Sequence, residues 1–208
     1  MKYKKYFRKT SLKQKNIGGL FLEEIQKRNP KSFLEIGIFH GVTARNVCEL
    51  MYENHGPNFS YTGIDIFDEG DQYKDEVTPV KTFNNPLKNF YFKYIKKQNP
   101  YSLEAVEDLL SKFQENITLL KGNSNEILKN IELEKVDFVF IDGGHEYNTV
   151  KNDLVHSHRL IKNKGTILCD DLNLSQALGV RQAIEEFSNE NKIEYEIVLE
   201  RFAKFDFN

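Results

Sequence analysis

The segment VDFVFIDGGH at residues 136–145 decides the fold, and GTILCDD at residues 165–171 repeats its pattern. Each is a run of apolar, β-branched and aromatic residues that ends in acid. Such a run is typical of a strand buried on both faces, as in a parallel sheet covered by helices. In open α/β sheets, ligands bind in the crevice just beyond the carboxyl ends of the strands. We therefore expect the carboxylates of Asp142, Asp170 and Asp171 at the mouth of that crevice, where they offer oxygen ligands to a hard cation.

On either side of these two segments, the hydropathy pattern predicts strands that alternate with helices along the chain. Strands are expected near residues 32–38, 61–67, 117–121, 136–141 and 166–169, with helices near 18–27, 43–52, 102–113, 124–130, 147–160 and 179–189. Residues 195–199 and 202–207 alternate in hydropathy and predict a closing β pair. This order predicts an α/β, Rossmann-like, doubly wound and mostly parallel seven-stranded sheet with a terminal antiparallel hairpin. Because 208 residues is a usual length for one domain, we expect a single domain over residues 1–208.

One segment breaks this alternation. About fifty residues separate the second and third expected strands, at 68–116, whereas a crossover needs only about a dozen. The helix at 102–113 supplies the crossover, so the aromatic-rich stretch at about 68–101 is interpreted as an insertion. Its aromatic density argues against disorder. Whether it caps the active site or forms a dimer contact, and so whether the protein is a homo-oligomer, is left open.

Composition excludes several classes of function. The formal net charge is −2, so no overall basic field favours a nucleic-acid partner. No apolar run approaches the roughly 20 residues that a membrane-spanning helix needs. Cys48 and Cys169 lie in apolar surroundings and form neither a metal motif nor a disulfide framework. We therefore expect a cytoplasmic protein with no membrane and no nucleic-acid partner.

The first expected strand runs into a glycine-containing loop, EIGIFHG at residues 35–41. Gly37 would allow a tight turn and close approach of a ligand, and Gly41 opens the next helix, whose free N–H groups favour an anionic group. The dinucleotide fingerprint Gly-x-Gly-x-x-Gly is not present, which disfavours an NAD enzyme. Asp65, at the end of the second strand, can accept both hydroxyls of a ribose. A capping or loop role for Asp65 is the alternative.

Several motifs together carry a family resemblance. They are EIGIFHG at 35–41, Asp65, GNS at 122–124, FIDGGHEY at 140–147 followed by Asp153-Leu154, and CDD at 169–171. In order and spacing, this set resembles class I S-adenosylmethionine-dependent methyltransferases. The segment at 140–147 is similar to the methyltransferase-domain-24 group, which is close to the metal-dependent catechol and macrolide-sugar O-methyltransferases. The resemblance covers about residues 32–208, without the insertion.

The resemblance implies a role for each matching residue. The methionine part of S-adenosylmethionine would be surrounded by the loop, the ribose bound by Asp65, and the adenine bordered by the start of the helix at 124–130. The implied cofactor-binding residues are Glu35, Gly37, His40, Gly41, Asp65, Asn123, Ser124 and Asp142. A passive loop role is the alternative for His40. The implied ligands of a divalent metal, with Mg²⁺ expected, are Asp142, Asp170 and Asp171.

The catalytic base departs from both relatives. In catechol-type enzymes it is a lysine three residues after the first metal-binding aspartate, and here that position is His145. In the sugar enzymes it is an aspartate two residues after it, and here that position is Gly144. His145 is our candidate base because imidazole titrates near neutral pH. A structural role at the start of the following helix is the alternative.

These observations predict a metal-assisted O-methyltransferase, with His145 and Asp142 as catalytic residues, that acts on a small hydroxylated molecule such as a sugar or a phenol. A metal would stabilise the ionised acceptor oxygen and orient it toward the methyl group. Two alternatives belong to other classes. One is a cofactor-binding or hydroxylase-like relative without methyl transfer. The other is an oligomeric interaction protein whose aromatic insertion is the functional surface.

Overall fold

The computed structural model describes residues 10, 12, 17–67, 85–175 and 177–207. The first part of the expected insertion, residues 68–84, lies outside the described residues, as do residues 1–9.

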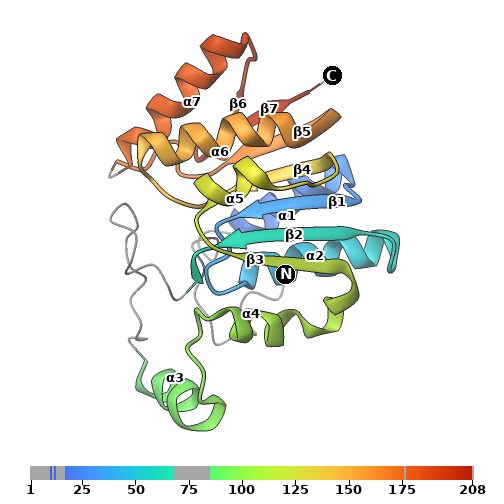
Figure 1. Cartoon of the computed structure of the whole chain (residues 1–208), viewed down its shortest axis with the longest axis vertical. Coiled ribbons are helices and arrows are strands. Elements are labelled where there is room, and N and C mark those ends of the chain that lie inside the picture. Colours follow the sequence, from blue (N-terminus) through green and yellow to red (C-terminus); the bar gives the residue numbers. More distant parts are fainter. Residues whose placement is uncertain (1–9, 11, 13–16, 68–84, 176, 208) are drawn as a thin grey trace.

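The described residues form one seven-stranded sheet in the order β3-β2-β1-β4-β5-β7-β6 (Figure 1). The strands are β1 (Ser32–Ile36), β2 (Ser60–Asp65), β3 (Ile117–Lys121), β4 (Val136–Ile141), β5 (Ile161–Cys169), β6 (Glu196–Val198) and β7 (Phe202–Asp206). β3, β2, β1, β4 and β5 are parallel neighbours, whereas β7 pairs antiparallel with both β5 and β6. The predicted doubly wound sheet with a terminal antiparallel hairpin is confirmed.

Helices cover both faces of the sheet. The helices are α1 (Ile17–Arg28), α2 (Val42–His55), α3 (Pro86–Phe90), the π-helix η4 (Tyr91–Lys96), α4 (Leu103–Leu110), the 3-10 helix η5 (Ser111–Asn116), α5 (Ser124–Asn130), α6 (Tyr147–Leu160) and α7 (Leu178–Asn191). Apolar residues of α1, α2 and α4 share one core cluster, and those of α5, α6 and α7 share the other. In Figure 1, α5 and α6 lie in front of the sheet and α1 and α2 behind it.

The central strand β4 shows why an unbroken apolar run forms a strand here. Successive side chains of a strand point to opposite faces. Phe138 and Phe140 accordingly belong to one cluster, and Val139 and Ile141 to the other. All four are buried. A strand with two covered faces has no solvent side, so its sequence carries no polar alternation.

Two elements differ from the sequence-based expectation. β5 begins at Ile161 rather than near residue 166, because its first residues pair with the start of β4 across a register shift between Val136 and Phe138. The crossover helix is also shorter than expected: α4 ends at Leu110 and continues as η5, in which Phe113 has non-helical backbone angles. Across the described residues, no helix is both long and apolar enough to cross a membrane.

Candidate active site

Three carboxylates meet at the carboxyl ends of β4 and β5. Asp142 follows β4, and Asp170 and Asp171 follow β5, so their positions result from two adjacent parallel strands. One oxygen from each lies within 4.8 Å of the others, and Asp170 is buried. Together with His145, they line a cavity of ≈ 10 Å³, which is about the space of one water-sized sphere. The arrangement suits a single small cation bound by oxygen.

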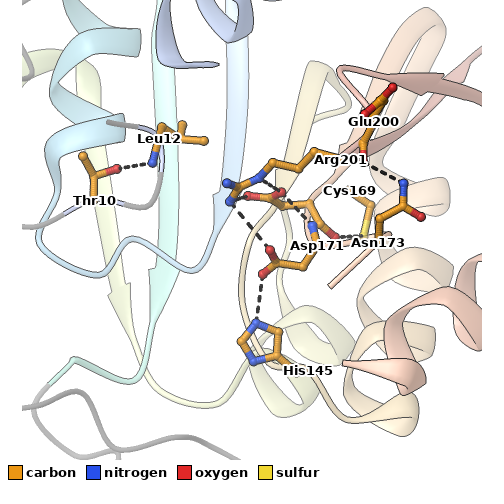
Figure 2. A network of polar contacts seen from close by, with 9 residues as sticks. Thr10, Leu12, His145, Cys169, Asp171, Asn173, Glu200 and Arg201 are labelled. Carbon is orange, nitrogen blue, oxygen red and sulfur yellow. Dashed lines mark hydrogen bonds and ion pairs between the residues drawn. The ribbon is translucent and has the colours of Figure 1, made fainter. Parts of the chain in front are cut away.

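A fourth charged residue, Arg201, was not expected from the sequence. Its guanidinium clamps the Asp170 carboxylate: Nε donates to Oδ1, and Nη2 donates to Oδ2 at 2.5 Å. Nη2 also lies 3.6 Å from Asp171 Oδ1. Figure 2 shows the Arg201 side chain reaching from the turn before β7 toward Asp171. The cluster therefore has an internal cation that compensates part of its negative charge.

The register of the hairpin explains how Arg201 reaches the acids. Cys169 pairs with Ala203 across β5 and β7, and the Leu172 N–H donates to the Arg201 carbonyl at 3.0 Å. An antiparallel pair continued from Ala203 toward the turn brings residue 201 beside residues 170–172. A basic residue just before the last strand was the available sequence signal, but only the register reveals its partner.

Asp142 differs from an ordinary surface aspartate in the pKa of its carboxyl group. Burial, followed by the neighbouring Asp170 and Asp171, raises the pKa of Asp142 well above its usual value, against the opposing effect of Arg201. Burial also raises the pKa of Asp170, although the Arg201 hydrogen bond lowers it in part. One guanidinium thus does not compensate three carboxylates. Strongly perturbed acids in a cleft are typical of functional sites, and these residues fit a divalent cation.

His145 lies at the rim of the same cluster. Its Nε2 is 2.9 Å from Asp171 Oδ2, and its side chain is 40% exposed. Because a carboxylate can only accept, Nε2 carries the proton of this bond, and the neutral ring has Nδ1 as its acceptor. Figure 2 shows the His145 ring pointing toward Asp171. His145 therefore combines a carboxylate that orients it with access to a molecule outside.

The glycine-containing loop packs directly against the acid cluster. Gly37 has a φ of +91°, and a Cβ built on it would lie 2.0 Å from the backbone oxygen of Asp142. The Asp142 N–H donates to the Ile36 carbonyl at 2.8 Å. A side chain at position 37 would thus collide with the backbone next to the acids. Gly41 has a φ of +72° and precedes α2, with no side chain capping that helix.

Asp65 holds this loop in place. Its Oδ2 accepts from the Ile38 and Phe39 N–H groups at 2.5 and 2.8 Å, and its Oδ1 accepts from the Phe67 N–H at 2.6 Å. Burial raises the pKa of Asp65 against these three bonds. A carboxylate has about four acceptor positions, so about one remains for a ligand. The expected two ribose hydroxyls would have to share it or displace a loop contact.

The remaining candidates are positioned around this loop. Glu35 is a buried residue of β1, and the Tyr61 hydroxyl donates to its Oε2 at 2.7 Å. His40 is buried, with its ring centroid 4.4 Å from that of Phe39 and 4.2 Å from that of Tyr101. This packing matches the passive loop role. Tyr101, at the end of the insertion, thereby joins that segment to the loop.

Asn123 and Ser124 follow β3, which β2 separates from β1 in the sheet. The Asn123 side chain caps α5 by accepting from the Asn125 N–H at 2.9 Å, and Ser124 is the first residue of that helix. Asn123 therefore has a structural task of its own. Its backbone and Ser124 remain at the carboxyl edge of the sheet, next to β2.

The strand order, the glycine-containing loop and the acids beyond β4 and β5 together define a class I methyltransferase. Comparison with known families agrees. The family model described as a methyltransferase domain, the methyltransferase-domain-24 family, matches residues 34–172, well over half of the chain. The chain belongs to this family and is an S-adenosylmethionine-dependent methyltransferase, which confirms the resemblance seen in its motifs.

Solved structures share the fold at low sequence identity. The O-methyltransferase NovP is 13% identical, with a TM-score of 0.65 over 93% of this chain and 78% of that one. An O-methyltransferase from Bacillus cereus in complex with SAH is 12% identical, with a TM-score of 0.60 over 98% and 84%. CalS11, a TDP-rhamnose 3'-O-methyltransferase of calicheamicin biosynthesis, is 14% identical, with a TM-score of 0.60 over 93% and 80%. A search of curated proteins gave no significant match.

Proposed function

We propose that this protein is a divalent-metal-assisted O-methyltransferase that acts on a small hydroxylated molecule such as a sugar or a phenol. The observation that carries the proposal is the convergence of Asp142, Asp170 and Asp171 on one ion-sized cavity with His145 at its rim. Oxygen-only ligands favour Mg²⁺ or Mn²⁺ over zinc. Structural relatives that act on oxygen, including one named for a nucleotide-linked sugar, support this choice of acceptor.

The cofactor would bind along the loop between β1 and α2. In this proposal, Glu35, Gly37, His40 and Gly41 form the wall of the methionine part, and Asp65 contacts the ribose through its remaining acceptor position. Asn123 and Ser124 border the adenine. Because Gly37 packs against the backbone of Asp142, a cofactor on this loop would lie beside the acid cluster. This proximity gives the methyl donor and the acceptor oxygen a common location.

The chain's residues have distinct tasks in the transfer. Bound at Asp142, Asp170 and Asp171, a divalent ion would supply Lewis-acid stabilisation of the ionised acceptor oxygen. Nδ1 of His145 accepts the acceptor's hydroxyl proton while Asp171 holds Nε2. The oxygen then forms its bond to the methyl carbon as the carbon–sulfur bond breaks, and the sulfonium leaves as a neutral thioether. A base oriented by a carboxylate follows the general logic of activated nucleophiles.

The packing of Tyr101 bears on the location of the acceptor. The described end of the insertion packs on the loop through Tyr101, which contacts Phe39 as well as His40. We therefore propose that the insertion borders the acceptor side of the site, in preference to serving only as a dimer contact. Removing it should leave cofactor affinity nearly intact and impair acceptor turnover. Unchanged turnover with conversion to a smaller species in light scattering would favour the dimer contact instead.

The test combines binding with transfer. Calorimetry should show that S-adenosylhomocysteine binds the wild-type protein, and NAD should not bind. A hydroxyl-compound library, assayed with labelled S-adenosylmethionine, should give transfer that EDTA abolishes and Mg²⁺ restores. Binding of S-adenosylhomocysteine without any transfer would instead indicate a cofactor-binding relative. Full transfer in EDTA would exclude the metal-assisted mechanism while leaving His145 as the candidate base.

A further inference from the structure

Resting on the proposed metal site, we infer that Arg201 is the built-in counter-cation of the acid cluster and competes with the divalent ion for Asp170. In this arrangement Arg201 holds the cluster together when no ion is bound and lowers its affinity for metal. The inference deepens the proposed function, because it says what sets the affinity of the site for its ion.

The contacts of Arg201 carry the inference. Two nitrogens of the guanidinium bond to the two oxygens of Asp170, and Asp170 Oδ1 additionally accepts from the Asp171 N–H at 2.6 Å. A paired fork of this kind is the strongest geometry for an ion pair. Both oxygens of Asp170 therefore accept hydrogen bonds within the protein. An ion that binds Asp170 must share or displace a bond to Arg201.

Burial makes this pair difficult to dispense with. The Asp170 side chain is 1% exposed and that of Arg201 is 20% exposed. A buried carboxylate that loses its partner is strongly destabilising, because its charge remains without solvation. Burial alone would lower the pKa of Arg201, but its bonds to Asp170 and the nearby acids raise it. Arg201 is thus a permanent positive charge at the cluster.

Charge counting gives the direction of the effect. Three carboxylates and one guanidinium carry a formal charge of −2, which one divalent ion neutralises. Without Arg201 the formal charge is −3, and Asp170 is available as a full ligand. The Arg201 guanidinium and a divalent ion are both positive, and they repel more strongly in a partly buried site than in water. Removal of Arg201 should therefore raise the affinity of the site for the metal. A purely structural arginine would instead loosen the cluster and weaken binding.

The experiment measures metal binding directly, with Mn²⁺ alone as the probe and electron paramagnetic resonance of free Mn²⁺ as the readout. Arg201→Met should bind Mn²⁺ at least about tenfold more tightly than wild type, given the charge removed at close range. Its ion-free form should melt at a lower temperature, and Mg²⁺ should raise that temperature more than in wild type. Arg201→Lys keeps the charge but not the two-pronged geometry, so its affinity should lie between the two.

The matched control is Lys162→Met. Lys162 forms an ion pair with Asp137 at 2.9 Å, at the amino end of β4 and away from the acid cluster. Its loss should leave Mn²⁺ affinity unchanged. If Arg201→Met does not fold, Arg201→Lys still tests the inference.

Each remaining outcome separates the inference from the proposed function. If wild type binds Mn²⁺ and both Arg201 variants bind it with equal or lower affinity, the inference is overturned and the metal site stands. Binding only after Arg201 is replaced would support it most strongly. If S-adenosylhomocysteine binds but neither wild type nor variants bind Mn²⁺, the metal site and the inference both fail, whereas the methyltransferase assignment stands.

Discussion

Two aspartates at opposite ends of β4 have opposite environments. Asp137, near the amino end of β4, accepts from the Lys31 and Ser32 N–H groups and the Ser32 hydroxyl, each at 2.9 Å, and from Lys162. Burial would raise its pKa, but Lys162 and Ser32 lower it overall. Asp142, just beyond the carboxyl end, has a raised pKa. The negative charge of Asp137 is compensated by its partners, whereas that of Asp142 is not.

The difference between Asp137 and Asp142 indicates which edge of the sheet carries the functional site. At the amino edge, the chain that enters β1 supplies N–H donors and a hydroxyl to Asp137, so the acid stabilises the fold. At the carboxyl edge, the acids after β4 and β5 face one another, and one arginine serves three carboxylates. Uncompensated charge costs stability, and strongly perturbed acids gathered in a cleft are typical of functional sites. The predictions below test this contrast.

The largest expected effect is on the uncompensated aspartate. Asp142→Asn should lower kcat/KM for methyl transfer by about 1,000-fold, since metal stabilisation of an ionised oxygen contributes several kcal/mol. The ion-free variant should be at least as stable as wild type, because a repelling charge has been removed. Transfer assays and urea unfolding check the two parts. An active Asp142→Asn variant would break the contrast between the two edges.

Next in size is the pH dependence of stability that Glu35 confers at the carboxyl edge. Burial raises the pKa of Glu35 to about 8 from 4.5, against the Tyr61 hydrogen bond. The folded protein then binds a proton that the unfolded chain has released, so stability falls as pH rises from 4.5 through about 8. The slope from this group is at most about 1.4 kcal/mol per pH unit.

Glu35→Gln should remove that slope. Urea unfolding of the ion-free protein between pH 5 and 9 should show a flatter decline in the variant than in wild type. If the free energy of unfolding falls with pH at the same slope in variant and wild type, Glu35 is ionised in the folded protein. Its negative charge would then be better compensated than its burial indicates.

These two predictions involve residues that the sequence had already singled out, and the reason is local. The apolar runs at 136–141 and 166–169 predicted buried parallel strands, and acids directly after such strands must meet at one edge. The mostly parallel sheet followed from the alternation of strands and helices, and the hairpin followed from the alternating hydropathy of residues 195–199 and 202–207. The start of β5 did not, because the polar residues 162–164 separate Ile161 from the apolar run, and only the pairing of Ile161 with Val136 extends the strand.

What the sequence could not supply was the partner of each acid. Arg201 lies about thirty residues after Asp170, and only the register of β5 with β7 brings them together. Asp65 was expected to face a ribose, yet three backbone N–H groups of nearby loops occupy most of its acceptor positions. Contacts between a side chain and a distant backbone depend on tertiary geometry, and no local pattern encodes them.

The effect expected for His145 is smaller than that for Asp142. His145→Ala should slow transfer by about 100-fold, the lower range for a general base, and leave Mn²⁺ affinity within a few-fold of wild type. Single-turnover assays at saturating acceptor isolate the chemical step. If the variant transfers at the wild-type rate, His145 is only a structural partner of Asp171. If it loses Mn²⁺ instead, its bond to Asp171 organises the metal site.

The smallest effect should come from the compensated aspartate. Asp137→Asn should cost about 1 kcal/mol of stability at pH 7, because its hydrogen bonds are charge-assisted but its side chain and that of Lys162 are 31% and 43% exposed. Since the folded pKa of Asp137 is lowered, this stabilisation is present above the ordinary aspartate pKa near 3.8 and is lost as pH falls through the folded value. Wild type and variant should therefore converge in acid, measured by urea unfolding from pH 7 to pH 3. Methyl transfer should be unchanged, and a large loss of activity would show that the amino edge of β4 also takes part in function.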